Sequence, residues 1–169
     1  MRFTGICYRA VDPRWSFAPA SGDGAAIRGA RFNPKGVPAL YLSTTTAGAV
    51  AEASQGFAYK FHPMTLCSFD VDCEDIVDLS TDDARQMAGV ELATLSCAWA
   101  AALTENRKPA SWVIHQSFSK AAAGILVPSF VNNVPAGATN LVLWKWGPNL
   151  PHKAVVFDPE SRLPKPPIA

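Results

Sequence analysis

Residues 29–56 read GARFNPKGVPALYLSTTTAGAVAEASQG and change character twice along their length. The first part, up to Pro38, is rich in glycine and proline and predicts an irregular loop. The run ALYLS predicts a short strand, and the threonines after it can cap a helix that runs to about Gln55 and stops at Gly56. A loop, a strand and a helix in such close succession indicate that short elements of both kinds are mixed in this chain.

The rest of the chain follows the same pattern. Cys67, Phe69 and Val71 alternate with polar neighbours, as in a half-buried strand. Because strands and helices do not follow one another in a regular βαβ order, we expect an α+β fold, with a mixed, bent or split β-sheet and short flanking helices. The expected strands are 5–11, 39–43, 66–72, 124–127, 141–146 and 154–157, and the expected helices are 44–55, one that begins at Ser80 or Thr81, 91–103 and 111–123.

Length and composition limit the class of protein. A chain of 169 residues, 49% of them apolar, predicts one domain, which we place at 1–158, followed by a proline-rich tail at 159–169. A formal net charge of +1 argues against direct binding of nucleic acid, because nucleic-acid-binding proteins usually carry a clear excess of basic residues. No run of eighteen apolar residues exists, so we expect no membrane span.

The cysteines and the N-terminus bear on the compartment. Cys7, Cys67, Cys73 and Cys97 form no C-x-x-C pair, and the three histidines share no ligand spacing with them. This pattern favours buried free thiols over disulfides or a metal site. The N-terminus lacks the apolar core of a secretory signal, and both observations predict a cytoplasmic protein without a bound metal.

Four polar residues stand out, and each has an ordinary alternative. The Arg31 guanidinium lies in an irregular loop, where it can bind a phosphate or simply face solvent. Tyr41 belongs either to the core or to a stacking surface for a heterocycle. Glu52 has no Lys or Arg three or four residues away, so it is either a surface carboxylate or a working group. Ser129 follows a strand without a G-x-S-x-G motif, which favours a hydrogen-bonding residue over a nucleophile.

These residues belong to short motifs that, in this order, resemble the RES-domain family. That family is named for its arginine, glutamate and serine, and Arg31, Glu52 and Ser129 stand at the matching positions. The chain differs at Ala30, where the family prefers glycine, and at Phe32, where it prefers tryptophan. The motifs are Tyr8-Arg9, 29–34 with Gly36, 40–43, Ala51-Glu52, 124–129 and 140–143.

The resemblance implies a toxin of a bacterial type II toxin–antitoxin pair, with an ADP-ribosyltransferase-like fold that cleaves the nicotinamide–ribose bond of NAD+. NAD+ would then be a consumed substrate. Glu52 would stabilise the positive charge that develops on the ribose, Arg31 would bind the pyrophosphate, and Tyr41 would pack on the nicotinamide ring. The residues expected to bind NAD+ are Arg31, Tyr41, Ser43, Ser129, Tyr8 and Arg9, and those expected in catalysis are Glu52, Arg31 and Tyr41.

The resemblance also implies a partner, an antitoxin of the Xre type that covers the active site. The acceptor of ADP-ribose is expected to be a side chain of a host protein. Two alternatives stay open: an NAD+ glycohydrolase or phosphorylase that depletes cellular NAD+, and a non-catalytic domain that binds a nucleotide or a partner. A glycan hydrolase would need two carboxylates, and only Glu52 lies in a motif.

Overall fold

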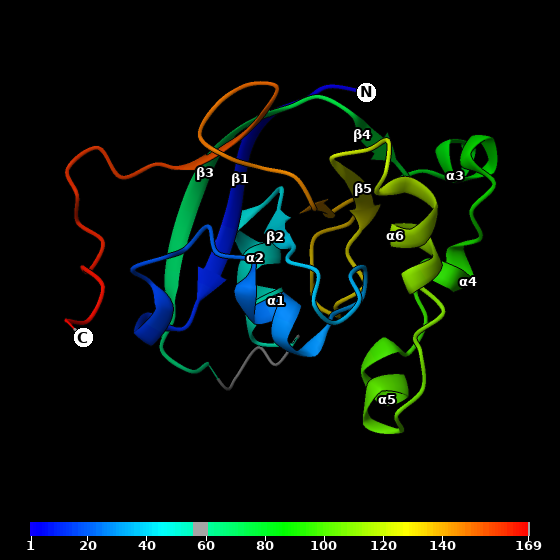
Figure 1. Ribbon diagram of the computed structural model, residues 1–169, viewed down its shortest axis with the longest axis horizontal. Helices are drawn as coiled ribbons and strands as arrows, with labels where there is room; N and C mark the ends of the chain where they lie inside the picture. Colours follow the sequence, from blue (N-terminus) through cyan, green and yellow to red (C-terminus); the bar gives the residue numbers. More distant parts are fainter. Residues whose placement is uncertain (56–60, 169) are drawn as a thin grey trace.

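The computed structural model describes residues 1–55 and 61–168, and their strands form one mixed sheet with helices beside it (Figure 1). In the described residues the sheet has seven strands in the order β4-β5-β6-β2-β1-β3-β7. Every neighbouring pair is antiparallel except β4 and β5, which are parallel. The strands are β1 Phe3–Val11, β2 Leu40–Ser43, β3 Thr65–Cys73, β4 Ile76–Asp78, β5 Gly124–Pro128, β6 Thr139–Leu143 and β7 His152–Val156. The expected α+β class is confirmed.

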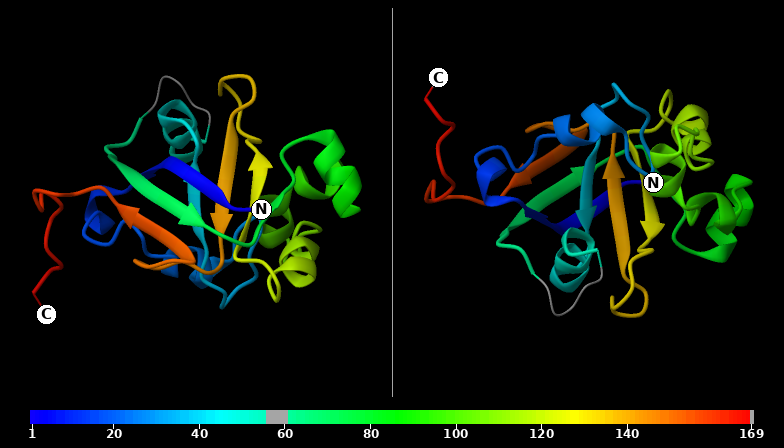
Figure 2. Two further views of the ribbon diagram at one scale, coloured as in Figure 1. Left: turned by 90° about the horizontal axis from the view of Figure 1, so that it is seen from above. Right: turned by 90° about the horizontal axis from the view of Figure 1, so that it is seen from below.

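The sheet bends between β2 and β1. These two strands share a single register pair, Tyr8 with Ser43, whereas β1 and β3 pair along their whole lengths. Figure 2 shows that the strands on either side of this junction run in clearly different directions. The bent or split sheet expected from the sequence is therefore present, and the bend lies beside the residues expected to carry function.

Two apolar clusters fill the two sides of the bent sheet. Because side chains alternate along a strand, Leu141 and Leu143 of β6 belong to one cluster and Val142 to the other. The first cluster also holds Phe69 and its alternating neighbours on β3, whose outward residues remain half-buried or exposed. The second cluster packs against the helices, with Ile114 of α6 fully enclosed. Of the four cysteines, three are buried, Cys97 is half-buried, and all are free thiols.

The helices are shorter than the sequence suggested. The helix expected at 91–103 is wrong as a single element, because the chain leaves helical geometry at Ser96 and re-enters it at Trp99. The helix expected to end near Gln55 stops at Ala53, and Gly56 lies outside the described residues. The helices are η1 Pro13–Trp15, α1 Asp23–Arg28, α2 Thr46–Ala53, α3 Asp82–Ala88, α4 Leu92–Leu95, α5 Trp99–Thr104 and α6 Trp112–Phe118.

Other boundaries also differ. The strand expected at 141–146 begins at Thr139 and ends at Leu143, where Trp144 turns away to bond with Ala123. The sequence missed β4, η1 and α1, each only three to six residues long and too short to show a period. Helices α3 to α6 gather beside β5, away from the C-terminus (Figure 1).

Residues 159–168 form no helix or strand, and Leu163 packs against the first cluster. The domain boundary at 158 remains a prediction. Within the described residues, no helix combines the length and apolar character needed to cross a bilayer.

Candidate functional site

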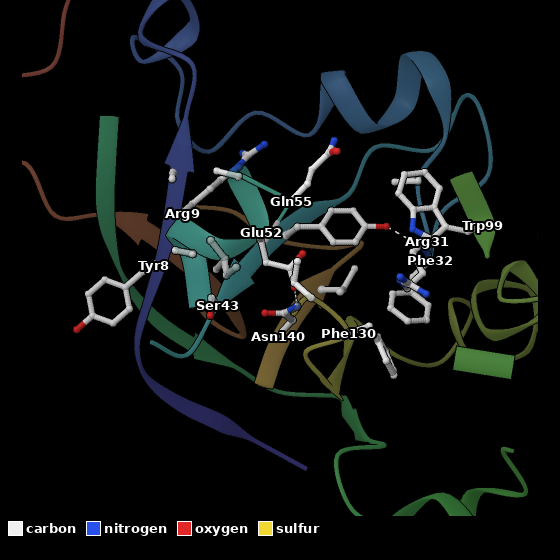
Figure 3. A pocket seen from close by; sticks show the side chains of 18 of the residues that line it. Tyr8, Arg9, Arg31, Phe32, Ser43, Glu52, Gln55, Trp99, Phe130 and Asn140 are labelled. Carbon is white, nitrogen blue, oxygen red and sulfur yellow. Dashed lines mark hydrogen bonds between the residues drawn. The ribbon is translucent and has the colours of Figure 1, made fainter. Parts of the chain in front are cut away.

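A cavity of about 540 Å³ opens beside the bend of the sheet. This volume lies in the range of small-molecule and cofactor sites. Six of the seven residues expected to carry function line it: Tyr8, Arg9, Arg31, Tyr41, Ser43 and Glu52. Figure 3 shows Arg9, Arg31, Ser43 and Glu52 at the cavity. Ser129, the seventh, does not line the cavity but donates a hydrogen bond to Glu52.

Helix α2 brings Glu52 to the cavity by packing unusually close to the sheet. The Thr45 hydroxyl caps the helix by accepting from the Gly48 N–H at 3.0 Å. A Cβ atom on Gly48 would lie 2.2 Å from the Ser43 Oγ, so only glycine permits this approach. Glu52 lies one turn later on the same face of the helix. The small residues of α2 therefore serve to place one carboxylate over the strands.

The Glu52 carboxylate is held by side chains from another part of the sheet. Ser129, just after β5, donates to Oε1 at 2.9 Å, and the Asn140 amide on β6 donates to the same oxygen at 2.5 Å. Glu52 itself stays exposed on the cavity side. Within the described residues, the buried Asn140 Oδ1 has no hydrogen-bond partner. Two donors orient the carboxylate, and its second oxygen, which has no hydrogen bond to any described residue, can take a ligand.

The Arg31 guanidinium is anchored at one end and available at the other. Its Nη1 donates to the carbonyls of Leu95 and Cys97 at 3.0 and 2.9 Å, and its carbon lies 4.9 Å from the centre of the Phe130 ring. Among the described residues, Nη2 and Nε make no hydrogen bond. Burial lowers the pKa of Arg31 from its usual value, against the opposing effects of Cys97, Glu52 and Tyr41. The remaining N–H pair has the geometry that binds two oxygens of a phosphate or carboxylate.

The Tyr41 hydroxyl is used inside the protein. It donates to the Asn33 Oδ1 at 2.7 Å and accepts from the Phe32 N–H at 2.9 Å, so it joins β2 to the Arg31 loop. Burial raises the pKa of Tyr41 well above its ordinary value. The phenol therefore stays neutral, and what the cavity receives from Tyr41 is the face or edge of its ring.

Arg9, Tyr8 and Ser43 occupy the other end of the cavity. The Arg9 Nη1 donates to the carbonyls of Pro19 and Ser21 at 2.7 and 2.8 Å, and burial lowers the pKa of Arg9. Figure 3 shows the Tyr8 ring directed away from Glu52. Ser43 is buried, and its Oγ accepts from the Thr45 N–H at 3.4 Å. Of these three residues, Arg9 adds a second positive charge to the cavity.

The structure adds lining residues to which the sequence assigned no role. Asn140 was visible only as the first residue of a motif, and its contact with Glu52 depends on the pairing of β6 with β2 and β5. Trp99 and Phe130 line the end of the cavity near Arg31 and bring aromatic surface to it. No sequence pattern marks Trp99. It begins α5 after the break at Ser96, and the alanine-rich run at 91–103 gives no sign of that break.

The charges of the cavity suit a ligand with an anionic and a cationic part. Two arginines, Arg9 and Arg31, line the cavity together with one acidic residue, Glu52. In the part of the chain that the structure describes, no group of three or more His, Cys, Asp or Glu side chains could hold a metal ion. The arginines can bind an anion, and the carboxylate can stabilise a nearby positive charge.

Comparison with known proteins bears on the fold and on the family of the chain. No curated protein matches the sequence. A solved structure, the crystal structure of the M. tuberculosis MbcT-MbcA toxin-antitoxin complex, contains a chain similar in fold, with a TM-score of 0.60 and 22% sequence identity over 94% of this chain and 84% of that one. A family model described as RES domain matches residues 6–165, a span that contains Arg31, Glu52 and Ser129. The resemblance noted in the sequence is thus confirmed, and the chain belongs to the RES-domain family.

Proposed function

We propose that the protein is a toxin of a toxin–antitoxin pair that cleaves the nicotinamide–ribose bond of NAD+ and transfers ADP-ribose to an acceptor, a protein side chain. The observation that carries the proposal is a single cavity in which an oriented carboxylate, Glu52, faces the same space as the anchored guanidinium of Arg31. The RES-domain membership and the fold shared with a chain of the MbcT-MbcA complex support it.

The reaction breaks the bond between ribose C1′ and the nicotinamide nitrogen. Nicotinamide leaves with the electron pair as a neutral molecule, and C1′ forms a bond to a nucleophilic atom of the acceptor, which loses a proton. Positive charge accumulates on the ribose as the first bond weakens. Oε1 of Glu52 is already held by Ser129 and Asn140. The carboxylate can therefore accept a hydrogen bond from a ribose hydroxyl and stabilise that charge without first changing its own position.

Arg31 and Tyr41 would act on other parts of the same molecule. The Nε and Nη2 groups of Arg31 would bind the pyrophosphate, because Nη1 is already held by carbonyls. The Tyr41 ring would lie against the nicotinamide, and its hydroxyl would hold the Arg31 loop. Arg9 supplies further positive charge at the cavity for the anionic substrate.

An exposed site that consumes a shared metabolite implies a partner that controls it. We propose an Xre-type antitoxin that covers the cavity, and action in the cytosol. When the toxin is expressed alone, growth should stop, and coexpression of the antitoxin should restore it. Normal growth at an expression level verified by blotting would count against a toxin.

The chemical proposal is tested with purified protein and NAD+ labelled in the ADP-ribose part. Release of nicotinamide together with label on a protein band from a cell lysate would support transfer to protein. Release of nicotinamide with all label in small molecules would instead indicate water or phosphate as acceptor. No release of nicotinamide in the presence of lysate would contradict cleavage of NAD+.

A further inference from the structure

The loop that carries Arg31 is held by its backbone carbonyls to an unusual extent. Three consecutive carbonyl oxygens, those of residues 30, 31 and 32, each accept a hydrogen bond from a side chain far away in the sequence. Such bonds fix the peptide planes of an irregular loop that has few regular backbone partners. The bonds are Trp112 Nε1 to Ala30 at 2.7 Å, Ser111 Oγ to Arg31 at 2.5 Å, and Trp144 Nε1 to Phe32 at 3.0 Å.

Ser111 is notable because its hydroxyl does not make the hydrogen bond that its position at the start of a helix predicts. It stands at the N-cap of α6, where serine normally accepts from a backbone N–H of the first turn. Here it makes no capping bond and donates to the Arg31 carbonyl instead. Ser111 is fully buried, so this bond is shielded from water. The hydroxyl therefore acts on the Arg31 loop and not on its own helix.

Further contacts hold the Arg31 loop closely against the start of α6. Gly29 has a φ of +75°, and a Cβ on it would lie 2.9 Å from the Trp112 ring, so the loop presses directly against the start of α6. The far end of the Arg31 side chain is held by the carbonyls of Leu95 and Cys97. Arg31 is thus fixed at its backbone by α6 and at its tip by the segment before α5.

We propose that Ser111 is a positioning residue: by holding the Arg31 carbonyl it sets the direction of the guanidinium and so the affinity of the cavity for an anionic ligand, without touching the ligand. The inference rests on the proposed function for the identity of that ligand. Loss of the bond leaves the 31–32 peptide held at its N–H alone, by the Tyr41 hydroxyl, and lets the base of the Arg31 side chain shift relative to its anchors. The Glu52 carboxylate is held by other residues and stays in place.

The test compares Ser111→Ala with Ser16→Ala. Ser16 is a matched control, because it is also a buried serine whose hydroxyl donates to a backbone carbonyl, that of Pro13 at 2.7 Å, away from the cavity. Affinities for inorganic pyrophosphate and for NAD+ are measured by calorimetry, with nicotinamide release and melting temperature on the same preparations. We expect Ser111→Ala to weaken both affinities about tenfold and to raise KM, with kcat near that of the wild type, as for the loss of one buried hydrogen bond.

A conservative variant separates positioning from general stability. Ser111→Thr keeps the hydroxyl and should recover most of the affinity, whereas Ser16→Ala should lower the melting temperature without changing affinity. If Ser111→Ala does not fold, Trp112→Phe replaces it, since it removes the N–H to the adjacent Ala30 carbonyl and keeps an aromatic ring. The same change in KM is expected there.

Each result decides the inference. A folded Ser111→Ala or Trp112→Phe protein with wild-type affinity, equal weakening by Ser16→Ala, or a fall in kcat alone would overturn it. Wild-type protein that binds neither probe would also overturn it, because no anion site would exist. Wild-type protein that binds NAD+ but releases no nicotinamide would refute the proposed function, while the affinities would still decide the role of Ser111.

Discussion

The Arg31 loop and helix α2 meet at one cavity, but they differ in how many contacts with distant parts of the chain hold them. Along the loop, side chains from two later parts of the chain hold three successive carbonyls, and the Tyr41 hydroxyl accepts from the Phe32 N–H among them. Helix α2 has only eight residues, most of them small, and its cap is a single threonine. Its one ionised side chain, Glu52, is exposed and held at one oxygen.

Under the proposed function, this difference predicts separate roles for the two regions. A rigidly held cation contributes equally to binding of the substrate and of the transition state, which sets affinity. A carboxylate that is oriented but still open to the ligand can respond to charge that appears only during reaction, which sets the rate. The experiments below separate these two roles by measuring affinity, rate and stability on the same variants.

The largest effect is expected for Glu52→Gln. The amide oxygen can still accept from Ser129 and Asn140, so the local structure should persist, but the negative charge is gone. Nicotinamide release should fall on the order of a hundred- to a thousandfold, with NAD+ affinity and melting temperature close to the wild type. The control is Glu91→Gln, another exposed glutamate that does not line the cavity. Turnover at the wild-type rate would remove Glu52 from the mechanism.

Arg31→Ala should act on affinity. Loss of a charged two-donor contact to phosphate corresponds to roughly ten- to a hundredfold weaker NAD+ binding. Stability should fall as well, because the carbonyls of Leu95 and Cys97 lose their donor. Arg31→Lys should recover part of the affinity, since a point charge cannot reproduce the planar group. NAD+ affinity is measured by calorimetry, with Arg14→Ala as the control, since Arg14 is a surface arginine paired with Asp12. Unchanged affinity in Arg31→Ala would show that the phosphates are bound elsewhere.

Tyr41→Phe should lower stability more than rate. The variant keeps the ring and loses both the bond to Asn33 and the bond from the Phe32 N–H. Leaving these buried groups unpaired costs about 1–3 kcal/mol of unfolding free energy. NAD+ affinity should weaken by a few fold because the Arg31 loop loosens. Denaturant unfolding and nicotinamide release measure the two effects, and a large loss of kcat with unchanged stability would assign the hydroxyl to catalysis.

The difference in unfolding free energy between the wild type and Tyr41→Phe should depend on pH. Burial raises the pKa of Tyr41 in the folded state, so above the ordinary tyrosine pKa of about 10 the unfolded chain loses a proton that the folded chain keeps. The unfolding free energy of the wild type should therefore fall as the pH rises beyond 10, and its advantage over Tyr41→Phe should narrow. Cys7 and Cys73, whose pKa values burial raises to about 12 and about 11, contribute equally to both proteins. A constant difference across this range would contradict the prediction.

The smallest effect is expected for Ser129→Ala. Asn140 still donates to the same Glu52 oxygen, so the carboxylate keeps one of its two hydrogen-bond donors. Nicotinamide release should fall about tenfold or less, with NAD+ affinity unchanged, because Ser129 does not line the cavity. A clear loss of affinity would place Ser129 in direct contact with the substrate.

Much of the architecture was legible in local patterns. The alternation of Cys67, Phe69 and Val71 identified β3, and the run of threonines at 44–46, of which Thr45 is the cap in the structure, indicated the start of α2. The alanine-rich run at 91–103 misled, because alanine favours a helix everywhere and marks no break. At the break, the carbonyls of Leu95 and Cys97, on either side of Ser96, accept hydrogen bonds from the Arg31 side chain, a contact that no local pattern could show.

For the site, the sequence by itself determined the candidate residues: an arginine in a glycine- and proline-rich loop, a carboxylate without a helical partner, and a serine after a strand. Only the tertiary structure decided what each of them contacts. Asn140 reaches Glu52 because β6 pairs with β2, and the Ser111 hydroxyl reaches Arg31 across 80 residues of chain. Periodicity and capping are set by neighbours along the chain, whereas hydrogen bonds between distant segments exist only once the apolar clusters have brought those segments together.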